Sequence, residues 1–187
     1  MTHVLTVIGK VCQAERGFEI RIGEAFWQGL TGLTHFSHAF VIWLANSAEA
    51  PGKVPLVCPA PYTACNQDVG VFASRSPARP NPICFSAIAI TGVDLKNGCI
   101  MTPYIDTFPE TQVIDIKPYF PASDLVSTAH IPAHFSHWPK SYEESAHFDW
   151  SAEFTDIRGK VDASFFRVTC QSKNRSGWIE LQPLLPL

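Results

Sequence analysis

The sequence predicts a mainly β protein: a small single β-barrel followed by a C-terminal extension of irregular and helical structure. Three observations lead to this prediction. Short strand patterns outnumber helix patterns, and the connections between them draw on the chain's 15 prolines and 11 glycines. Many short strands with such turn residues favour a barrel or sandwich over alternating βαβ units. From about residue 122 onward, the composition shifts to histidine and aromatic residues without regular alternation.

The predicted strands follow one another from the N-terminus. "HVLTVIG" (3–9) is apolar and β-branched, "FEIRIG" (18–23) alternates with a period of two, and "HAFVIWLA" (38–45) has the continuous apolar run of a strand buried on both faces. "ICFSAIAITGV" (83–93) is long enough to cross a barrel, and "VIDIKPY" (113–119) alternates until its proline. The remaining predicted strands are residues 69–74, 99–106, 164–170 and 178–182.

Helix patterns are few. "GEAFWQGL" (23–30) predicts one or two helical turns. "SYEESAHF" (141–148) begins with a serine and reaches a glutamate three residues later, which is the capping-box pattern of a helix N-terminus. We therefore expect residues 1–125 to form the barrel and residues 126–187 to form an extension that packs on the barrel or on a partner subunit.

Composition and charge narrow the class of protein. The net charge of −3 means that any contact with nucleic acid must use a local basic patch. The longest apolar stretch, residues 39–45, is too short to cross a bilayer, and the N-terminus lacks the pattern of a secretory signal. Six cysteines form no CxxC pair, which favours reduced thiols in a cytoplasmic protein over a disulfide scaffold.

The segment "RSPARPNPICFS" (75–86) combines stiffness with charge. Its prolines 77, 80 and 82 exclude a helix and fix the backbone before any tertiary contact forms. Arg75 and Arg79 carry forked donors that suit carboxylates or phosphates. The spacing fits a preorganised binding loop and a proline-rich connector with solvated arginines equally well.

A second polar segment is "VIDIKPYFP" (113–121). Asp115 and Lys117 are two residues apart, so they share one face of a strand, and Tyr119 follows the proline. Such a set at a strand end suits acid–base chemistry and hydrogen bonding. A salt bridge on a strand surface is the other interpretation, and it is the more common case.

Other chemistries lack their sequence patterns. The chain has no GxGxxG, Walker or GxSxG segment. His130, His134 and His137 stand close together in the sequence, but Pro132 interrupts a regular helix and no nearby cysteine or carboxylate completes a ligand set. We therefore predict no metal site.

Taken together, the segments resemble the TsaA-like (TrmO) family. "VGVFASRSPARPNPICFS" and "VIDIKPYFPASD" are similar to the family's "GVFATRS-x-x-RPNPIG-x-S" and "DGTPV-x-DIKPY", and "GLTHFSHAFVIWL" is similar to "GL-x-x-FSHLW". The resemblance covers roughly residues 5–125, with the motifs in order. It implies a dimeric β-barrel methyltransferase that uses S-adenosylmethionine (SAM) to methylate N6 of threonylcarbamoyladenosine beside the tRNA anticodon.

The resemblance also implies the site residues. The positions that match the family's reacting end, and are expected to be catalytic, are Asp115, Lys117 and Tyr119. The positions that match its cofactor contacts are Asn46, Ser47, Arg75, Phe85, Glu110, Thr111, Gln112 and Val113.

Three departures from the family pattern keep alternatives open. Cys84 stands where the family has glycine, and "FPETQV" (108–113) lacks the glycine and proline of "LDGTPV". The region 126–187 does not resemble the family's tRNA-engaging tail. A SAM-dependent methyltransferase of a different, small acceptor and a non-catalytic SAM-binding module are therefore the alternatives to the tRNA enzyme.

Overall fold

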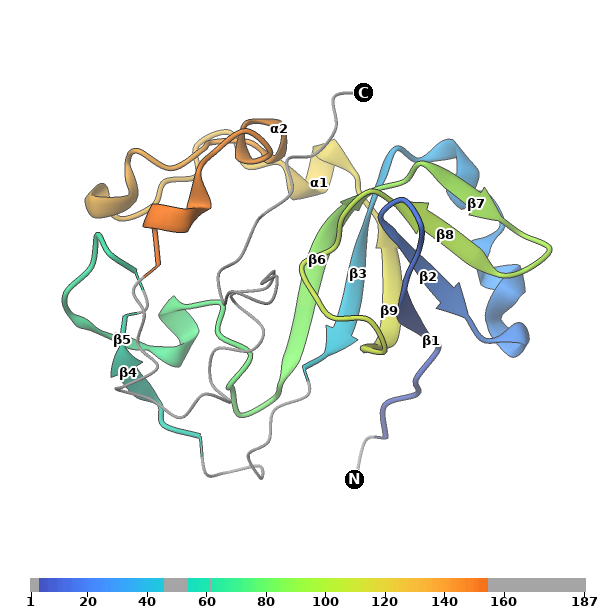
Figure 1. Cartoon of the computed structure of the whole chain (residues 1–187), viewed down its shortest axis with the longest axis horizontal. Coiled ribbons are helices and arrows are strands. Elements are labelled where there is room, and N and C mark those ends of the chain that lie inside the picture. Colours follow the sequence, from blue (N-terminus) through green and yellow to red (C-terminus); the bar gives the residue numbers. More distant parts are fainter. Residues whose placement is uncertain (1–3, 46–53, 61, 155–187) are drawn as a thin grey trace. The chain divides into compact units, whose positions relative to one another are not determined.

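The computed structural model describes residues 4–45, 54–60 and 62–154. The chain divides into two compact units (Figure 1). The sheet unit consists of Met1–Asn46 and Asn81–Leu125, and the second unit of Ser47–Pro80 and Val126–Leu187. The predicted boundary at residue 125 and the packing partner of the extension stay predictions.

The sheet unit contains seven antiparallel strands, which confirms the mainly β prediction. All of its neighbouring strands pair in antiparallel ladders, and two 3₁₀ segments and one short α-helix complete it (Figure 1). In sheet order, the strands are β6 (Ile83–Ala89), β3 (His38–Leu44), β9 (Gln112–Pro118), β1 (Gly9–Gln13), β2 (Phe18–Ile22), β8 (Cys99–Thr102) and β7 (Gly92–Asp94). The helical segments are η1 (Glu24–Leu30), η2 (Leu33–His35) and α1 (Pro121–Asp124).

The core lies on one face of this sheet. Along β3, Ala39, Val41 and Trp43 are buried, while the residues between them are only partly covered, as period-two alternation requires. Trp43 donates its indole N–H to the buried Ser86 hydroxyl at 3.0 Å, so a polar pair is satisfied inside the core. The largest fully buried side chains are Ile20, Ile88, Ile100, Ile105, Val11, Val41, Val113 and Thr102.

The predicted long strand over residues 83–93 is divided. β6 pairs with β3 and β7 pairs with β8, so these two strands lie at opposite ends of the sheet order. Only Ile90 and Thr91 separate them in the chain; the N–H of Ile90 donates to Ser37 O and that of Thr91 to Met101 O. Closure of the sheet into a barrel stays a prediction.

β3 and β6 are direct antiparallel neighbours although a long segment separates them in sequence. Their register runs from His38↔Ala89 to Leu44↔Ile83. One residue further, the N–H of Ala45 donates to the carbonyl of Pro82 at 2.8 Å. The chain therefore leaves the sheet and returns to it at one place.

Several strand boundaries differ from the prediction. The first strand is β1 rather than residues 3–9, because its partner β2 ends at Ile22 and the helical segment η1 follows. Residues 69–74 contain only the short β5 (Asp68–Gly70), after which η3 (Val71–Ala73) turns the chain. β8 ends before Pro103, which has no N–H to donate. The predicted strands 164–170 and 178–182 lie outside the described residues.

Both predicted helical segments are confirmed. Residues 24–30 form the 3₁₀ segment η1, whose Trp27 donates to Ile22 O at 2.7 Å. Gly98 has a φ of 63° and approaches Trp27 so closely that a Cβ there would overlap the indole. α2 (Tyr142–Ser145) is capped by Ser141, whose hydroxyl accepts from Glu144 N at 3.2 Å.

The second unit combines a hairpin with the described part of the extension. β4 (Val57–Pro59) and β5 form an antiparallel pair. The extension adds η4 (Ala133–Phe135), α2 and η5 (Trp150–Ala152). No helix among the described residues is long and apolar enough to span a membrane.

Candidate functional site

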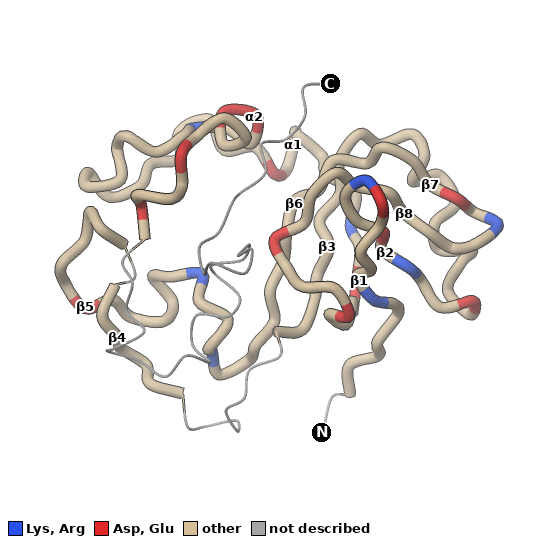
Figure 2. The backbone as a smooth tube through the Cα atoms, viewed as in Figure 1, with Lys and Arg blue, Asp and Glu red and all other residues tan. Residues whose placement is uncertain are grey.

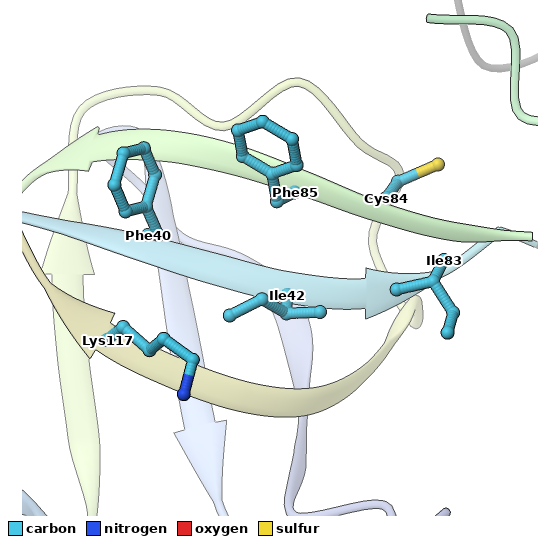
Figure 3. Close-up of a pocket in the computed structure, with 6 residues that line it drawn as sticks. All are labelled: Phe40, Ile42, Ile83, Cys84, Phe85 and Lys117. Atoms are coloured by element: carbon cyan, nitrogen blue, oxygen red, sulfur yellow. The ribbon is translucent and has the colours of Figure 1, made fainter. Parts of the chain in front are cut away.

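The face of the sheet opposite the core carries a partly exposed apolar surface. Phe40 and Ile42 of β3 lie beside Ile83 and Phe85 of β6, and Lys117 of β9 stands at its border (Figure 3). The side chains of Phe85 and Ile83 are 50% and 41% exposed. They line an open depression of about 270 Å³, to which Cys84 also contributes.

Aromatic rings run across this surface. The rings of Phe40 and Phe85 meet edge to face with centroids 5.6 Å apart, and Tyr119 lies 5.5 Å from Phe40 on its other side. His38 lies 6.4 Å from Tyr119. Exposed aromatic rings on a sheet offer stacking faces for a flat heterocycle.

Asp115 and Lys117 lie on the same face of β9, as their spacing predicts. The Lys117 ammonium is 2.8 Å from the Asp115 carboxylate, and both side chains are about half exposed or more. The other carboxylate oxygen of Asp115 accepts from Ile116 N at 2.9 Å. The register pairs Asp115 with Ile42 and Lys117 with Phe40, so the charged pair borders the aromatic surface.

The turn before β9 holds an unusual backbone conformation. Glu110 is the one non-glycine residue with a positive φ, 70°, among the described residues. Its carboxylate is 2.7 Å from the ammonium of Lys10, and this contact raises the pKa of Lys10. Thr111 is buried, and its hydroxyl oxygen accepts from Thr107 Oγ1 at 2.9 Å. The turn therefore adopts the conformation that glycine favours although a glutamate occupies it.

Residues 74–80, which we call the arginine loop, belong to the second unit and are stabilised by hydrogen bonds within the loop. Arg79 donates through one guanidinium nitrogen to the carbonyls of Ser74 at 2.8 Å and Ser76 at 3.3 Å. The Ser76 hydroxyl accepts from Ala78 N at 3.3 Å. Arg79 thus bonds within its own loop, whereas Arg75 is the arginine that the sequence resemblance predicts to be functional.

The predicted site residues lie in several places. Phe85, Asp115, Lys117 and Tyr119 gather around one face of the sheet. Glu110 and Thr111 lie in the turn before β9, whereas Gln112 and Val113 are the first two residues of that strand and Val113 is fully buried in the core. Arg75 lies in the second unit. Asn46 and Ser47 lie outside the described residues. Their functional roles stay predictions.

Sequence reasoning missed Phe40 and Ile42 as parts of this surface. We interpreted the run "HAFVIWLA" as a strand buried on both faces, and this was wrong for one face. Neither polarity nor size distinguished the two faces in the sequence. The outward residues Phe40 and Ile42 are apolar too, and the inward residues range in size from Ala39 to Trp43.

The histidine-rich segment forms a polar contact of a different kind. Nε2 of His137 lies 2.9 Å from the carboxylate of Glu153, and Trp138 donates its indole N–H to the same oxygen at 2.7 Å. The Trp138 bond is the largest effect that lowers the pKa of Glu153. Among the described residues, no group of three or more His, Cys, Asp and Glu side chains could hold a metal ion.

Basic residues of the sheet unit stand singly on separate elements, with acidic residues between them (Figure 2). Lys10, Arg21 and Lys117 each form an ion pair with a neighbouring carboxylate. The Asp115–Lys117 pair at the border of the aromatic surface therefore carries no net formal charge.

A comparison with known families matches residues 9–125 to a model described as the tRNA-methyltransferase O N-terminal domain. The match includes both motif segments and stops before the extension. It covers every predicted site residue.

Curated relatives agree with this match. The chain is 38% identical over 87 residues to a tRNA (adenine(37)-N6)-methyltransferase of Eikenella corrodens, covering 46% of this chain and 49% of that protein. It is 31% identical over 99 residues to a probable S-adenosyl-L-methionine-binding protein of Halobacterium salinarum, covering 53% of this chain and 73% of that one. The match thus spans about half of the bacterial methyltransferase.

Solved structures have the same fold. The crystal structure of TrmO aligns with a TM-score of 0.57 at 26% identity, over 71% of this chain and 64% of that one. The crystal structure of TrmO from Pseudomonas aeruginosa aligns with a TM-score of 0.54 at 27% identity, over 71% of this chain and 63% of that one.

Proposed function

This chain belongs to the tRNA-methyltransferase O N-terminal domain family, and we propose on that premise that it is a SAM-dependent methyltransferase that modifies N6 of an adenine in tRNA. The proposed acceptor is the threonylcarbamoyladenosine beside the anticodon. The observation that carries the proposal is the Asp115–Lys117 pair at the border of the aromatic surface. A stacking face and a proton acceptor are the two things that methylation of a base amine needs from a protein.

The depression and its border fit the cofactor and the acceptor chemically. Bound SAM supplies a methyl group on a sulfonium, and the aromatic edges and faces of Phe40 and Phe85 suit both a cation and an adenine ring. We propose that Phe85 and the turn 110–113 contribute to holding SAM. Arg75 is proposed to bind an anionic group of the cofactor or acceptor, for which its forked donors are suited.

The chain's own residues would act on the acceptor amine. As N6 forms its bond to the methyl carbon, the carbon–sulfur bond breaks and the amine must lose a proton. Asp115 is proposed to accept this proton, directly or through water. Lys117 forms an ion pair with the Asp115 carboxylate, and the ring of Tyr119, next to Phe40, is proposed to position the base.

Three further properties belong to this proposal. β6 and β7 are one nearly continuous segment at the two ends of the sheet order, which supports a closed barrel. A homodimer is the arrangement that the family resemblance implies. A tRNA substrate implies that the enzyme works in the cytoplasm.

The first test measures methyl transfer from labelled SAM to tRNA isolated from cells that lack the protein. Asp115→Asn should lower the rate by about 100-fold with SAM affinity unchanged, because it removes the proton acceptor and keeps the shape. Glu19→Gln is the matched control, since Glu19 forms a similar exposed pair with Arg21 at 2.9 Å on β2. Full activity of Asp115→Asn would refute the assignment.

The same cells distinguish the alternative functions. A 14 Da difference in a tRNA nucleoside between wild-type and deletion strains would support the tRNA enzyme, since one methylene adds that mass. SAM binding without this difference would favour the small-acceptor enzyme, or a SAM-binding module if no acceptor is found. Absence of SAM binding by calorimetry would contradict all three.

A further inference from the structure

The extension and the arginine loop belong to the same compact unit, although the family match ends at residue 125. The described part of the extension, residues 126–154, lies outside the family's domain, whereas the loop carries the family's motif arginine. The contacts within this unit form a continuous path between them.

The path begins with Tyr62, which follows β4. Its ring packs against Phe135 at 5.0 Å, Trp138 at 5.4 Å and Phe154 at 5.8 Å between centroids. All three partners come from the extension. Tyr62 also pairs with Phe154 in an isolated antiparallel bridge.

Thr63 joins the same two segments through hydrogen bonds. Its N–H donates to the carbonyl of Glu153 at 3.0 Å, and its hydroxyl donates to the carbonyl of Ala152 at 2.9 Å. The Glu153 side chain is fixed in turn by Trp138 and His137. Both backbone and side chains therefore attach the hairpin to the extension.

The path continues from the hairpin into the loop. Cys58 of β4 and Ala78 of the loop are both buried in one small core, with Val54 and Val69 packed against them. Leu56 O accepts from Val71 N at 2.9 Å, at the start of η3. The hairpin therefore contacts the arginine loop through this small core, and it contacts the segment just before the loop through the backbone bond of Val71.

Electrostatics connects the two ends of the path. Burial raises the pKa of the Tyr62 hydroxyl, and the nearby charge of Arg75 acts in the opposite direction. The guanidinium of Arg75 is therefore close enough to interact electrostatically with Tyr62, the residue against which the extension packs.

We propose that residues 126–154 act as a clamp that holds the Arg75 loop in its binding conformation, with Tyr62 as the positioning residue. The proposal rests on the proposed function, since Arg75 must bind part of the cofactor or acceptor for the clamp to matter. Ordering the loop beforehand lowers the entropic cost of binding. Residues 126–154 would thereby contribute to ligand binding by Arg75, although they lie far from Arg75 in the sequence.

The test uses the full-length protein and hydrogen exchange of the amides in residues 71–80. Tyr62→Ala should accelerate exchange there by roughly tenfold or more, because it removes three ring contacts. Tyr62→Phe keeps the ring and should restore slow exchange. Amides of β3 and β9 report on the integrity of the sheet unit and should not change. Phe26→Ala, a truncation of a partly exposed ring in the sheet unit, is the control.

Calorimetry with SAM provides the second readout. Tyr62→Ala should bind SAM roughly tenfold more weakly, and Arg75→Ala should bind it at least as weakly. Unchanged exchange in residues 71–80 of Tyr62→Ala would overturn the clamp. Unchanged SAM affinity of Tyr62→Ala would also overturn it if Arg75→Ala binds SAM weakly. If wild-type protein bound no SAM or Arg75→Ala bound it normally, the proposed role of Arg75 would fail, while the exchange data would still decide whether the clamp exists.

Discussion

The two motif segments of this chain are positioned in different ways. Asp115 and Lys117 stand on β9, a strand paired on both sides by backbone hydrogen bonds to β3 and β1. The loop around Arg75 has no ladder and depends on side chains: the guanidinium of Arg79, two serine hydroxyls and a small apolar core. A motif on a strand inherits its geometry from the sheet, whereas a motif on a loop must be supported by particular residues elsewhere.

Of the variants considered, Arg79→Ala should weaken SAM binding through the arginine loop most, while β9 stays unchanged. It removes the donor to Ser74 O and Ser76 O, at a cost of about 2 kcal/mol for partly buried bonds from a charged group. We expect a roughly thirtyfold loss of SAM affinity, measured by calorimetry. The exchange of β9 amides should stay as in the wild type; if they accelerate too, the two segments are not independent.

Ser86→Ala tests the sheet unit. Here we expect a change in the stability of the sheet and no selective change in the arginine loop. The variant leaves the buried Trp43 indole N–H without its partner, so we expect a loss of about 1–2 kcal/mol in the free energy of unfolding by denaturant. Ser86→Thr retains a hydroxyl and is the control. Exchange in residues 71–80 should not change before global unfolding, and selective loosening of that loop would contradict the contrast.

Glu110 allows a finer test, because it places a side chain where the backbone favours glycine. Glu110→Gly should be more stable than Glu110→Ala by about 1 kcal/mol, since both lose the exposed pair with Lys10 and only glycine relieves the φ of 70°. Thermal or denaturant unfolding measures this difference. Equal stability would mean that the turn changes conformation in the variants.

Acid should loosen the contact of Thr63 with residues 152–153 in the second unit. The pKa of Glu153 lies below its ordinary value of 4.5, chiefly because of the Trp138 bond and with help from His137, while burial and, to a smaller extent, Asp149 oppose the shift. Its stabilisation is therefore fully present above pH 4.5 and is lost as the pH falls through the lowered pKa. Exchange of the Thr63 amide below pH 4.5, corrected for intrinsic rates, should rise in the wild type and be flatter in Glu153→Gln. Parallel profiles would exclude this role.

The same contrast explains which features were predictable. The shared face of Asp115 and Lys117 follows from strand periodicity alone, and the structure confirms it. The role of Arg79 within its own loop did not follow, because proline stiffness gives no information about which arginine bends back. The packing of the extension on Tyr62 could not be predicted either, because it joins residues far apart in the sequence and follows no repeating pattern. The mainly β class was accessible from local patterns, and the support of the loop was not.

The chain leaves the sheet after β3 and re-enters it at β6 in one place, which limits the entropic cost of the segment between them. Because Leu44 pairs with Ile83 and Ala45 bonds to Pro82, this segment connects two neighbouring strands in the manner of a hairpin loop. Each doubling of such a connection adds only about 0.6 kcal/mol of closure entropy. The intervening segment can therefore differ in length at a small entropic cost while β3 and β6 keep their register.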